Sequence, residues 1–373
     1  METLSLTLLF SGLSFFLILI CYPFLVYVKF IIRTNIINKS DSFLVPVSII
    51  ISCYNEEEYI REKIVSIINE SEWIPGSELI IVSCGVTDNT NIILEEFFDN
   101  EKLVIVIIHE RLSKIDGVNL AVAKSKNEIL VFSDCRQNTK SGSIKHLIHN
   151  FNDPSVGTVT GSLVDTKNAT KQSFFRSLFN SMAIKESTVS SSLNVYGALY
   201  AQRKSVFREI PRDLLFDDLF VVVSTLSQKK RLIQDEHATI YDVNFNDYYQ
   251  SERIARLVRG LLIFLSNHTK LIKSLPIGVL LRFVFFKYLK LLMPFFLALL
   301  LFGVVTFLIS NHNLYLYMGV LIAAIAPLLN AKSRKFLSLF IKINYYFMTS
   351  TLSYLFGIKR SNNWEKLHVK SRK

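Results

Sequence analysis

The sequence predicts an α/β fold in which a doubly wound, mostly parallel sheet is joined to N-terminal and C-terminal transmembrane helices. Two observations support the sheet. Between about 45 and 135, short apolar runs typical of strands alternate with stretches whose apolar residues have helical spacing, and polar residues follow several of the short runs. The membrane helices are supported by a third observation, because two long stretches of the chain contain no charged residue.

Composition limits the class of protein. Of the 373 residues, 50% are hydrophobic, and the mean hydropathy of +0.33 is too apolar for a disordered chain and high for a wholly soluble one. The net charge of +11 suits a membrane protein with basic cytoplasmic segments; a nucleic-acid binder is the alternative, which the apolar stretches disfavour. The four cysteines lack C-x-x-C spacing, so disulfides and structural zinc are not expected.

The first transmembrane helix is expected within residues 1–30. The stretch from Leu4 to Val28 contains no charged residue and exceeds the roughly 20 residues that cross a bilayer. A cleaved signal peptide is the alternative, but Glu2 precedes the stretch, which is also too long for one. A linker is expected to follow at 31–44.

A second uncharged region, 291–331, predicts a transmembrane hairpin. Polar residues at 310–313 divide it into spans of about 291–309 and 314–330. Lysine and arginine flank the hairpin but do not occur in its turn, so the positive-inside rule places the flanks in the cytoplasm. The region 45–270 is then a cytoplasmic domain, and the N-terminus lies outside.

Two further apolar segments beside the hairpin contain basic residues. Residues 271–290 include Arg282 and Lys287 and are expected to form an interfacial helix. Residues 332–373 include an apolar stretch, 336–357, with basic flanks on both sides. A single crossing would place one basic flank outside, so an interfacial or re-entrant helix with a basic cytoplasmic tail is favoured.

Between the membrane segments, strands and helices alternate. Strands are expected at the short apolar runs, 47–52, 78–82, 103–108 and 128–132. Helices are expected where the apolar spacing is helical, at 57–70, 88–98 and 118–125. Ligands of such sheets bind beyond the carboxyl ends of the strands. Polar sets that each contain an acid follow three of the runs and predict a nucleotide-type site, at 53–56, 83–88 and 133–136.

Several motifs of the chain, in one order, together resemble those of the membrane-bound family 2 inverting glycosyltransferases, which have the GT-A fold. They are Y-N-E at 54–56, C-G-V-T-D-N-T at 84–90, R-L-S-K at 111–114, S-D-C-R at 133–136, F-D-D-L at 216–219, R-x-x-R-L at 253–257 and W-E-K at 364–366. The resemblance implies a GT-A-like sheet. It also implies inverting transfer of a sugar from a nucleotide sugar to a saccharide or lipid-linked acceptor, in the synthesis of a cell-surface polysaccharide or glycolipid.

The resemblance implies that Asp218 is the catalytic base, with Asp217 beside it. Inverting transfer needs a carboxylate that takes the proton of the acceptor hydroxyl, and repulsion between adjacent acids raises the pKa of one of them. An exposed acidic turn is the alternative, which the apolar residues on both sides disfavour.

Asp134 falls where the family holds the divalent metal of the donor diphosphate, either Mg²⁺ or Mn²⁺. A helix cap is the alternative role. Arg136 stands where the family has a second acid. This departure from the family's pattern predicts a donor contact for Arg136, because a guanidinium group can contact a phosphate directly, and with it a weaker dependence on metal.

Further donor-binding residues follow from the same resemblance. Cys84 replaces an acid that the family uses against the nucleoside, which weakens the preference for a UDP-sugar without removing it. Asp88 on the same loop binds the nucleoside or only caps a helix, and Lys114 is expected to contact a donor phosphate. The remaining candidates are Asn55 and Glu56 after the first strand, and Arg253 and Arg256, which either clamp the diphosphate or face anionic lipid.

A catalytically degenerate family member that acts as a binding or assembly subunit is the alternative function. The departures at Cys84 and Arg136 suggest it, whereas the presence of Asp134, Asp218 and Lys114 argues against it. The expected partners are a nucleotide sugar, a saccharide or lipid-linked acceptor, and membrane lipids, without nucleic acid. The expected location is a cell or inner membrane, crossed more than once.

Overall fold

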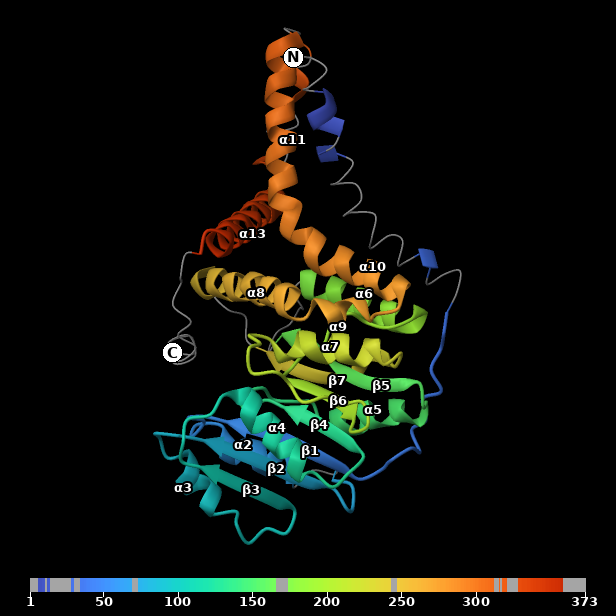
Figure 1. Cartoon of the computed structure of the whole chain (residues 1–373), viewed down its shortest axis with the longest axis vertical. Helices are drawn as coiled ribbons and strands as arrows, with labels where there is room; N and C mark the ends of the chain where they lie inside the picture. The colour runs from blue at the N-terminus through green and yellow to red at the C-terminus, as the bar shows by residue number, and fades with distance from the viewer. Residues whose placement is uncertain are drawn as a thin grey trace. The chain divides into compact units, whose positions relative to one another are not determined.

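The computed structural model describes residues 6–10, 12–13, 28–29, 34–68, 73–165, 174–242, 247–311, 315, 317–320 and 328–357 (Figure 1). The chain divides into two compact units. The first comprises Val26–Asn244 and His268–Val279, and the second comprises Met1–Leu25, Phe245–Asn267 and Leu280–Lys373.

The first unit is built on a seven-stranded sheet with the order β3-β2-β1-β4-β6-β5-β7 (Figure 1). Its strands are β1 (Val47–Cys53), β2 (Glu78–Cys84), β3 (Leu103–Ile108), β4 (Ile129–Ser133), β5 (Val156–Asp165), β6 (Leu199–Arg203) and β7 (Arg231–Asp242). Among the described strands, β6 runs antiparallel to β4 and β5, and all other neighbouring pairs are parallel. The predicted mostly parallel sheet is therefore confirmed.

The described helices of this unit are α2 (Ile60–Ile68), α3 (Thr90–Glu95), α4 (Lys114–Lys124), α5 (Ser143–His149), the short 3-10 helix η1 (Asn150–Asn152), α6 (Phe174–Val189), α7 (Asp217–Ser227) and α9 (Thr269–Lys273). One of them begins earlier than predicted. Ser113 and Asp116 form a capping box, so α4 starts at Lys114 rather than at the first clearly periodic apolar residue, Val118.

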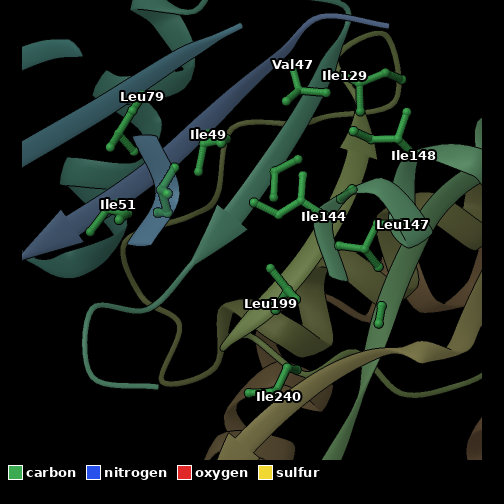
Figure 2. Packing of buried hydrophobic residues seen from close by; sticks show 14 of the residues in the cluster. Val47, Ile49, Ile51, Leu79, Ile129, Ile144, Leu147, Ile148, Leu199 and Ile240 are labelled. Carbon is green, nitrogen blue, oxygen red and sulfur yellow. The ribbon is translucent and has the colours of Figure 1, made fainter. Parts of the chain in front are cut away.

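The core lies on both faces of the sheet. Successive side chains of a strand point to opposite faces, and Val47 and Ile49 of β1 share one cluster with Ile144 of α5 (Figure 2). Ile64 of α2 belongs to the same cluster. On the other face, α4 packs on β1 and β2. Strands that are buried on both faces contain continuous apolar runs, which explains why their positions could be predicted from the sequence.

One edge of the sheet collects the ends of several strands. The strands β1, β2 and β4 are parallel and in register, so their carboxyl ends meet at this edge. The antiparallel strand β6 begins there, because Leu199 pairs with Ser133 and the amide of Asp134 donates to the carbonyl of Ala198 at 3.2 Å. The polar sets that follow the predicted strands are therefore brought together.

The second unit contains long helices. They are α8 (Asp247–Asn267), α11 (Lys290–Asn311) and α13 (Ala331–Leu355). The helix α10 (Ile277–Phe283), which begins in the first unit, and the π-helix η2 (Val284–Leu289) lead directly into α11. Within the described residues, one helix, Ile277–Ser310, has the length and apolar composition needed to cross a membrane. Within the interfacial helix expected at 271–290, residues 277–290 continue directly into α11, because Arg282 and Lys287 do not interrupt the helical backbone. The placement of this helix at the membrane surface stays a prediction.

Several expected membrane segments fall largely outside the described residues. These are the N-terminal helix within 1–30, the second half of the hairpin, and the tail that contains Trp364. In the described part of the N-terminal segment, Gly12 closely approaches Leu300 of α11, since a Cβ atom at Gly12 would lie 2.9 Å from the Leu300 Cβ. The α13 helix covers most of 336–357 and packs on α8 and α11; its interfacial placement stays a prediction.

Candidate active site

Lys114 joins two parts of the site. Its Nζ donates to Asp134 Oδ1 at 2.8 Å and lies 3.7 Å from Asp217 Oδ2. The three residues come from the start of α4, the end of β4 and the start of α7. Burial disfavours the charged form of Lys114, but the negative charges of Asp134 and Asp217 have the larger effect and raise the pKa of Lys114. The side chain therefore stays protonated.

Asp218 presents a buried carboxyl oxygen to the backbone of Gly197. This oxygen, Oδ1, lies where a Cβ atom at Gly197 would be only 2.3 Å away. Burial and the neighbouring Asp217 raise the pKa of Asp218 to about 8, against the opposing effects of Lys114 and the Gly197 amide. A carboxyl group with this pKa suits the role of a general base near neutral pH.

The first turn of α7 is half-buried. Asp217 and Asp218 are both partly covered, and the flanking residues Leu214, Leu219 and Phe220 are buried. The side chains of the two acids are therefore not those of an exposed acidic turn, which was the alternative to a cleft. Burial of the apolar neighbours explains why two adjacent acids are held next to the sheet edge.

Arg136 and Glu56 form an ion pair between neighbouring strand ends. The Arg136 Nε lies 2.7 Å from both carboxylate oxygens of Glu56, and their side chains are only 16% and 12% exposed. Arg136 follows β4 and Glu56 follows β1. Glu56 thus compensates the charge of Arg136 within the protein, and the donor contacts expected of both residues stay predictions.

Hydrogen bonds tie the loops after β1 and β2 together. Asp88 accepts from the backbone N–H groups of Thr90 at 3.0 Å and Glu57 at 3.2 Å. Asn55 and Thr87 exchange two hydrogen bonds of 2.9 and 3.0 Å, and Asn55 adopts the left-handed region with a φ of 52°. Asp88 therefore has the structural role at a helix start that the sequence left open, and its contact with a nucleoside stays a prediction.

The thiol of Cys84 packs inside the fold. A Cβ atom at Gly117 of α4 would lie 3.3 Å from the Cys84 Sγ, and burial raises the pKa of this thiol.

Tyr54 and Arg111 are more accessible to solvent than Cys84, and they contact each other. The guanidinium carbon of Arg111 lies 3.1 Å from the Tyr54 ring centroid. Sequence reasoning did not select this pair as a site, although both residues belong to the quoted motifs.

The structure thus brings together most of the residues predicted for the site. Arg253 and Arg256 lie on α8, which belongs to the second unit. Their contact with the donor diphosphate, and the alternative contact with lipid, both stay predictions.

Asp134 meets the requirements of a metal site only in part. Within the described ranges, no three or more His, Cys, Asp or Glu side chains are grouped to hold a metal ion. Asp134 Oδ1 accepts from Lys114, and no described residue donates to its Oδ2. One carboxylate suits Mg²⁺ or Mn²⁺ when the remaining ligands are substrate phosphates and water. The site fits an ion that binds together with the donor, rather than a preformed centre.

Comparison with known proteins identifies relatives of the first unit. Residues 48–211 match the sequence model of the family described as "Glycosyl transferase family 2". The poly-beta-1,6-N-acetyl-D-glucosamine synthase of Staphylococcus epidermidis is 25% identical over 142 residues, which cover 38% of this chain and 34% of that protein. The protein of the same name from Staphylococcus aureus (strain COL) is 24% identical over 117 residues, 31% of this chain and 28% of that protein. The chain matches about a third of the length of these curated relatives.

A solved structure shares the fold. The mannosyltransferase PcManGT from Pyrobaculum calidifontis, in complex with GDP-Man and Mn²⁺, is similar over 96% of this chain and 99% of that one. The TM-score is 0.75 and the sequence identity is 17%. The likeness shows a common fold, which agrees with the mostly parallel sheet predicted from the sequence.

Proposed function

We propose, because residues 48–211 match the sequence model of glycosyl transferase family 2, that the chain transfers a sugar, with inversion, from a nucleotide sugar to a saccharide or lipid-linked acceptor. The observation that carries the proposal is the carboxyl group of Asp218. It has a raised pKa and a buried oxygen, and it lies beside Asp217 and the Lys114–Asp134 pair. Such a group can take a proton from a hydroxyl group bound in front of it.

In the proposed reaction, the acceptor hydroxyl oxygen forms a bond to the anomeric carbon, while the bond between that carbon and the donor phosphate oxygen breaks. Asp218 takes the hydroxyl proton. The electron pair of the broken bond leaves with the nucleoside diphosphate, whose negative charge is offset by the ammonium group of Lys114. Attack opposite the leaving group inverts the configuration of the anomeric carbon.

A divalent ion is part of the proposal. Asp134 would hold Mg²⁺ or Mn²⁺ together with the donor phosphates, and the ion supplies charge neutralisation of the leaving diphosphate when bound. Lys114 lies against the same carboxylate and provides a permanent cation. Removal of the metal should therefore reduce the transfer rather than abolish it.

We place the reaction at the cytoplasmic face of a membrane, in the synthesis of a cell-surface polysaccharide or glycolipid. The helix Ile277–Ser310 supports membrane attachment, and the basic residues that flank the predicted hairpin support the orientation. A UDP-sugar is the favoured donor class. GDP-sugars are the competing class, because one solved structure with a similar fold is a complex with GDP-Man.

The test measures nucleoside diphosphate release by the purified full chain in detergent, with a panel of UDP- and GDP-sugars, with and without Mn²⁺. Turnover of one donor supports the proposal if Asp218→Asn removes it and the exposed control Asp99→Asn keeps it. Turnover that persists in Asp218→Asn contradicts the assigned base. Donor binding without turnover under every condition would support the alternative, a binding or assembly subunit.

A further inference from the structure

The loop between β6 and α7, residues 204–216, brings Asp217 and Asp218 to the site. The N-cap residue of α7, Phe216, makes no side-chain hydrogen bond to the first turn. A helix start without a side-chain cap leaves its first N–H groups to other partners, so its position depends on contacts made by the preceding loop.

Asn119 on α4 binds the backbone of this loop with both ends of its amide. Its Nδ2 donates to the carbonyl of Ile210 at 2.9 Å, and the N–H of Ile210 donates to Asn119 Oδ1 at 3.0 Å. Ile210 is only 1% exposed. Water cannot readily replace these two bonds, so their loss would leave a buried donor and a buried acceptor unpaired.

Two other residues of α4 contact the same segment of chain. Lys114 lies 3.7 Å from Asp217 and touches the site directly. Asp116 pairs with Arg212, but Arg212 is 81% exposed, and an ion pair in water contributes little to stability.

Gln228, directly after α7, holds the start of the segment, because its Nε2 donates to the carbonyl of Val206 at 2.8 Å. Asn119 holds the buried middle of the segment at Ile210, and Lys114 lies at the end next to the site.

We propose that Asn119 is a positioning residue for the catalytic base: by fixing Ile210 on α4, it holds Asp218 against Gly197 and next to Lys114. The inference rests on the proposed function. Asn119 acts through the loop and not on the reacting atoms. A displaced base slows proton transfer, whereas the donor contacts expected at the ends of β1, β2 and β4 do not involve the loop.

The test compares Asn119→Ala with Asn127→Ala in the full chain. Asn127 is a matched control because its Nδ2 also donates to a backbone carbonyl, that of Gly76, at 3.3 Å. Neither Asn127 nor Gly76 belongs to the loop 204–216 or to the site. Asn119→Ala is expected to lower kcat about 10- to 100-fold at an unchanged KM for the donor. Asn127→Ala is expected to keep both constants.

Hydrogen exchange gives a readout that does not depend on turnover. The amides of residues 205–218 should exchange faster in Asn119→Ala than in the wild type or in Asn127→Ala. If Asn119→Ala does not fold, Asn119→Asp, which keeps the acceptor oxygen and loses the donor, takes its place in both measurements.

The inference is overturned if kcat of the Asn119 variant stays within about twofold of the wild type. It is also overturned if exchange of residues 205–218 is unchanged, or if kcat falls only as far as in Asn127→Ala. A wild-type chain that turns over no donor refutes the proposed function, and the exchange experiment then still decides whether Asn119 fixes the loop.

Discussion

Lys114 Nζ donates to Asp134 Oδ1 at 2.8 Å, and this bond joins the first residue of α4 to the first residue after β4. The carboxylate expected to hold a metal therefore already has a cation beside it. The same ammonium group is 3.7 Å from Asp217, the neighbour of the proposed base. The ammonium group of Lys114 thus links the carboxylate of the expected metal ligand to that of the neighbour of the proposed base.

Loss of the base should remove transfer and keep donor binding. Asp218→Asn preserves the shape of the side chain but cannot accept the hydroxyl proton, so kcat is expected to fall roughly 10²- to 10⁴-fold. Donor affinity, measured by calorimetry, should match that of the exposed control Asp99→Asn. A variant with nearly normal turnover would show that another group is the base.

The pH dependence should report the raised pKa of Asp218. The base must be deprotonated to act, so kcat/KM of the wild type should rise with pH through about 8 and then level off. Asp217→Asn removes the adjacent negative charge, which lowers the pKa of Asp218 and shifts this limb to lower pH. The assignment would be contradicted if the rise of kcat/KM with pH occurred near pH 4 in the wild type, or if it occurred at the same pH in Asp217→Asn as in the wild type.

Dependence on metal should become stricter when Lys114 loses its charge. After chelation with EDTA, the wild type is expected to retain reduced activity, because Lys114 still offsets the charge of the leaving diphosphate. Lys114→Gln should have no measurable activity without metal, while the exposed control Lys140→Gln should behave as the wild type. Complete loss of wild-type activity on chelation would refute this role.

The Glu56–Arg136 pair should contribute to stability. Arg136→Ala removes the guanidinium partner of a largely buried carboxylate and is expected to cost roughly 3 kcal/mol of the free energy of unfolding. The double variant Glu56→Gln/Arg136→Ala should melt at a higher temperature than Arg136→Ala alone. Arg61→Ala, which breaks the exposed pair with Glu96, is the control and should change the melting temperature little.

The same Arg136 variant tests the expected phosphate contact. Arg136→Ala should raise KM for the donor if the guanidinium group reaches a phosphate, and Arg61→Ala should not. An unchanged KM in a folded Arg136→Ala would restrict this arginine to its pairing with Glu56.

Membrane orientation can be measured with single cysteines at Asn311 and at the exposed Glu101. Only Cys21 needs replacement beforehand, because Cys53, Cys84 and Cys135 are buried and burial raises the pKa of each thiol, which slows its reaction. In intact cells, Asn311→Cys should react with an impermeant maleimide, and Glu101→Cys should react only after lysis. The opposite pattern would reverse the proposed topology.

Much of the sheet could be predicted because its strands are continuous apolar runs, including the half-buried edge strand β3. β3 was expected at 103–108 and spans Leu103–Ile108, and β1 differs from its expected range by one residue. Runs of apolar residues indicate such strands without knowledge of their neighbours. The signal for the early start of α4 is also local in the sequence, since Ser113 and Asp116 have the spacing of a capping box.

The candidate site depended more on tertiary structure. Asp134 and Asp218 could be selected from motifs, but the partner of Arg136 could not, because Glu56 is 80 residues away. Asn119 and Ile210 are likewise 91 residues apart. These contacts follow from the strand order, which places β4 between β1 and β6. Apolar spacing determines which segments become strands and helices, whereas packing among those elements decides which side chains face one another.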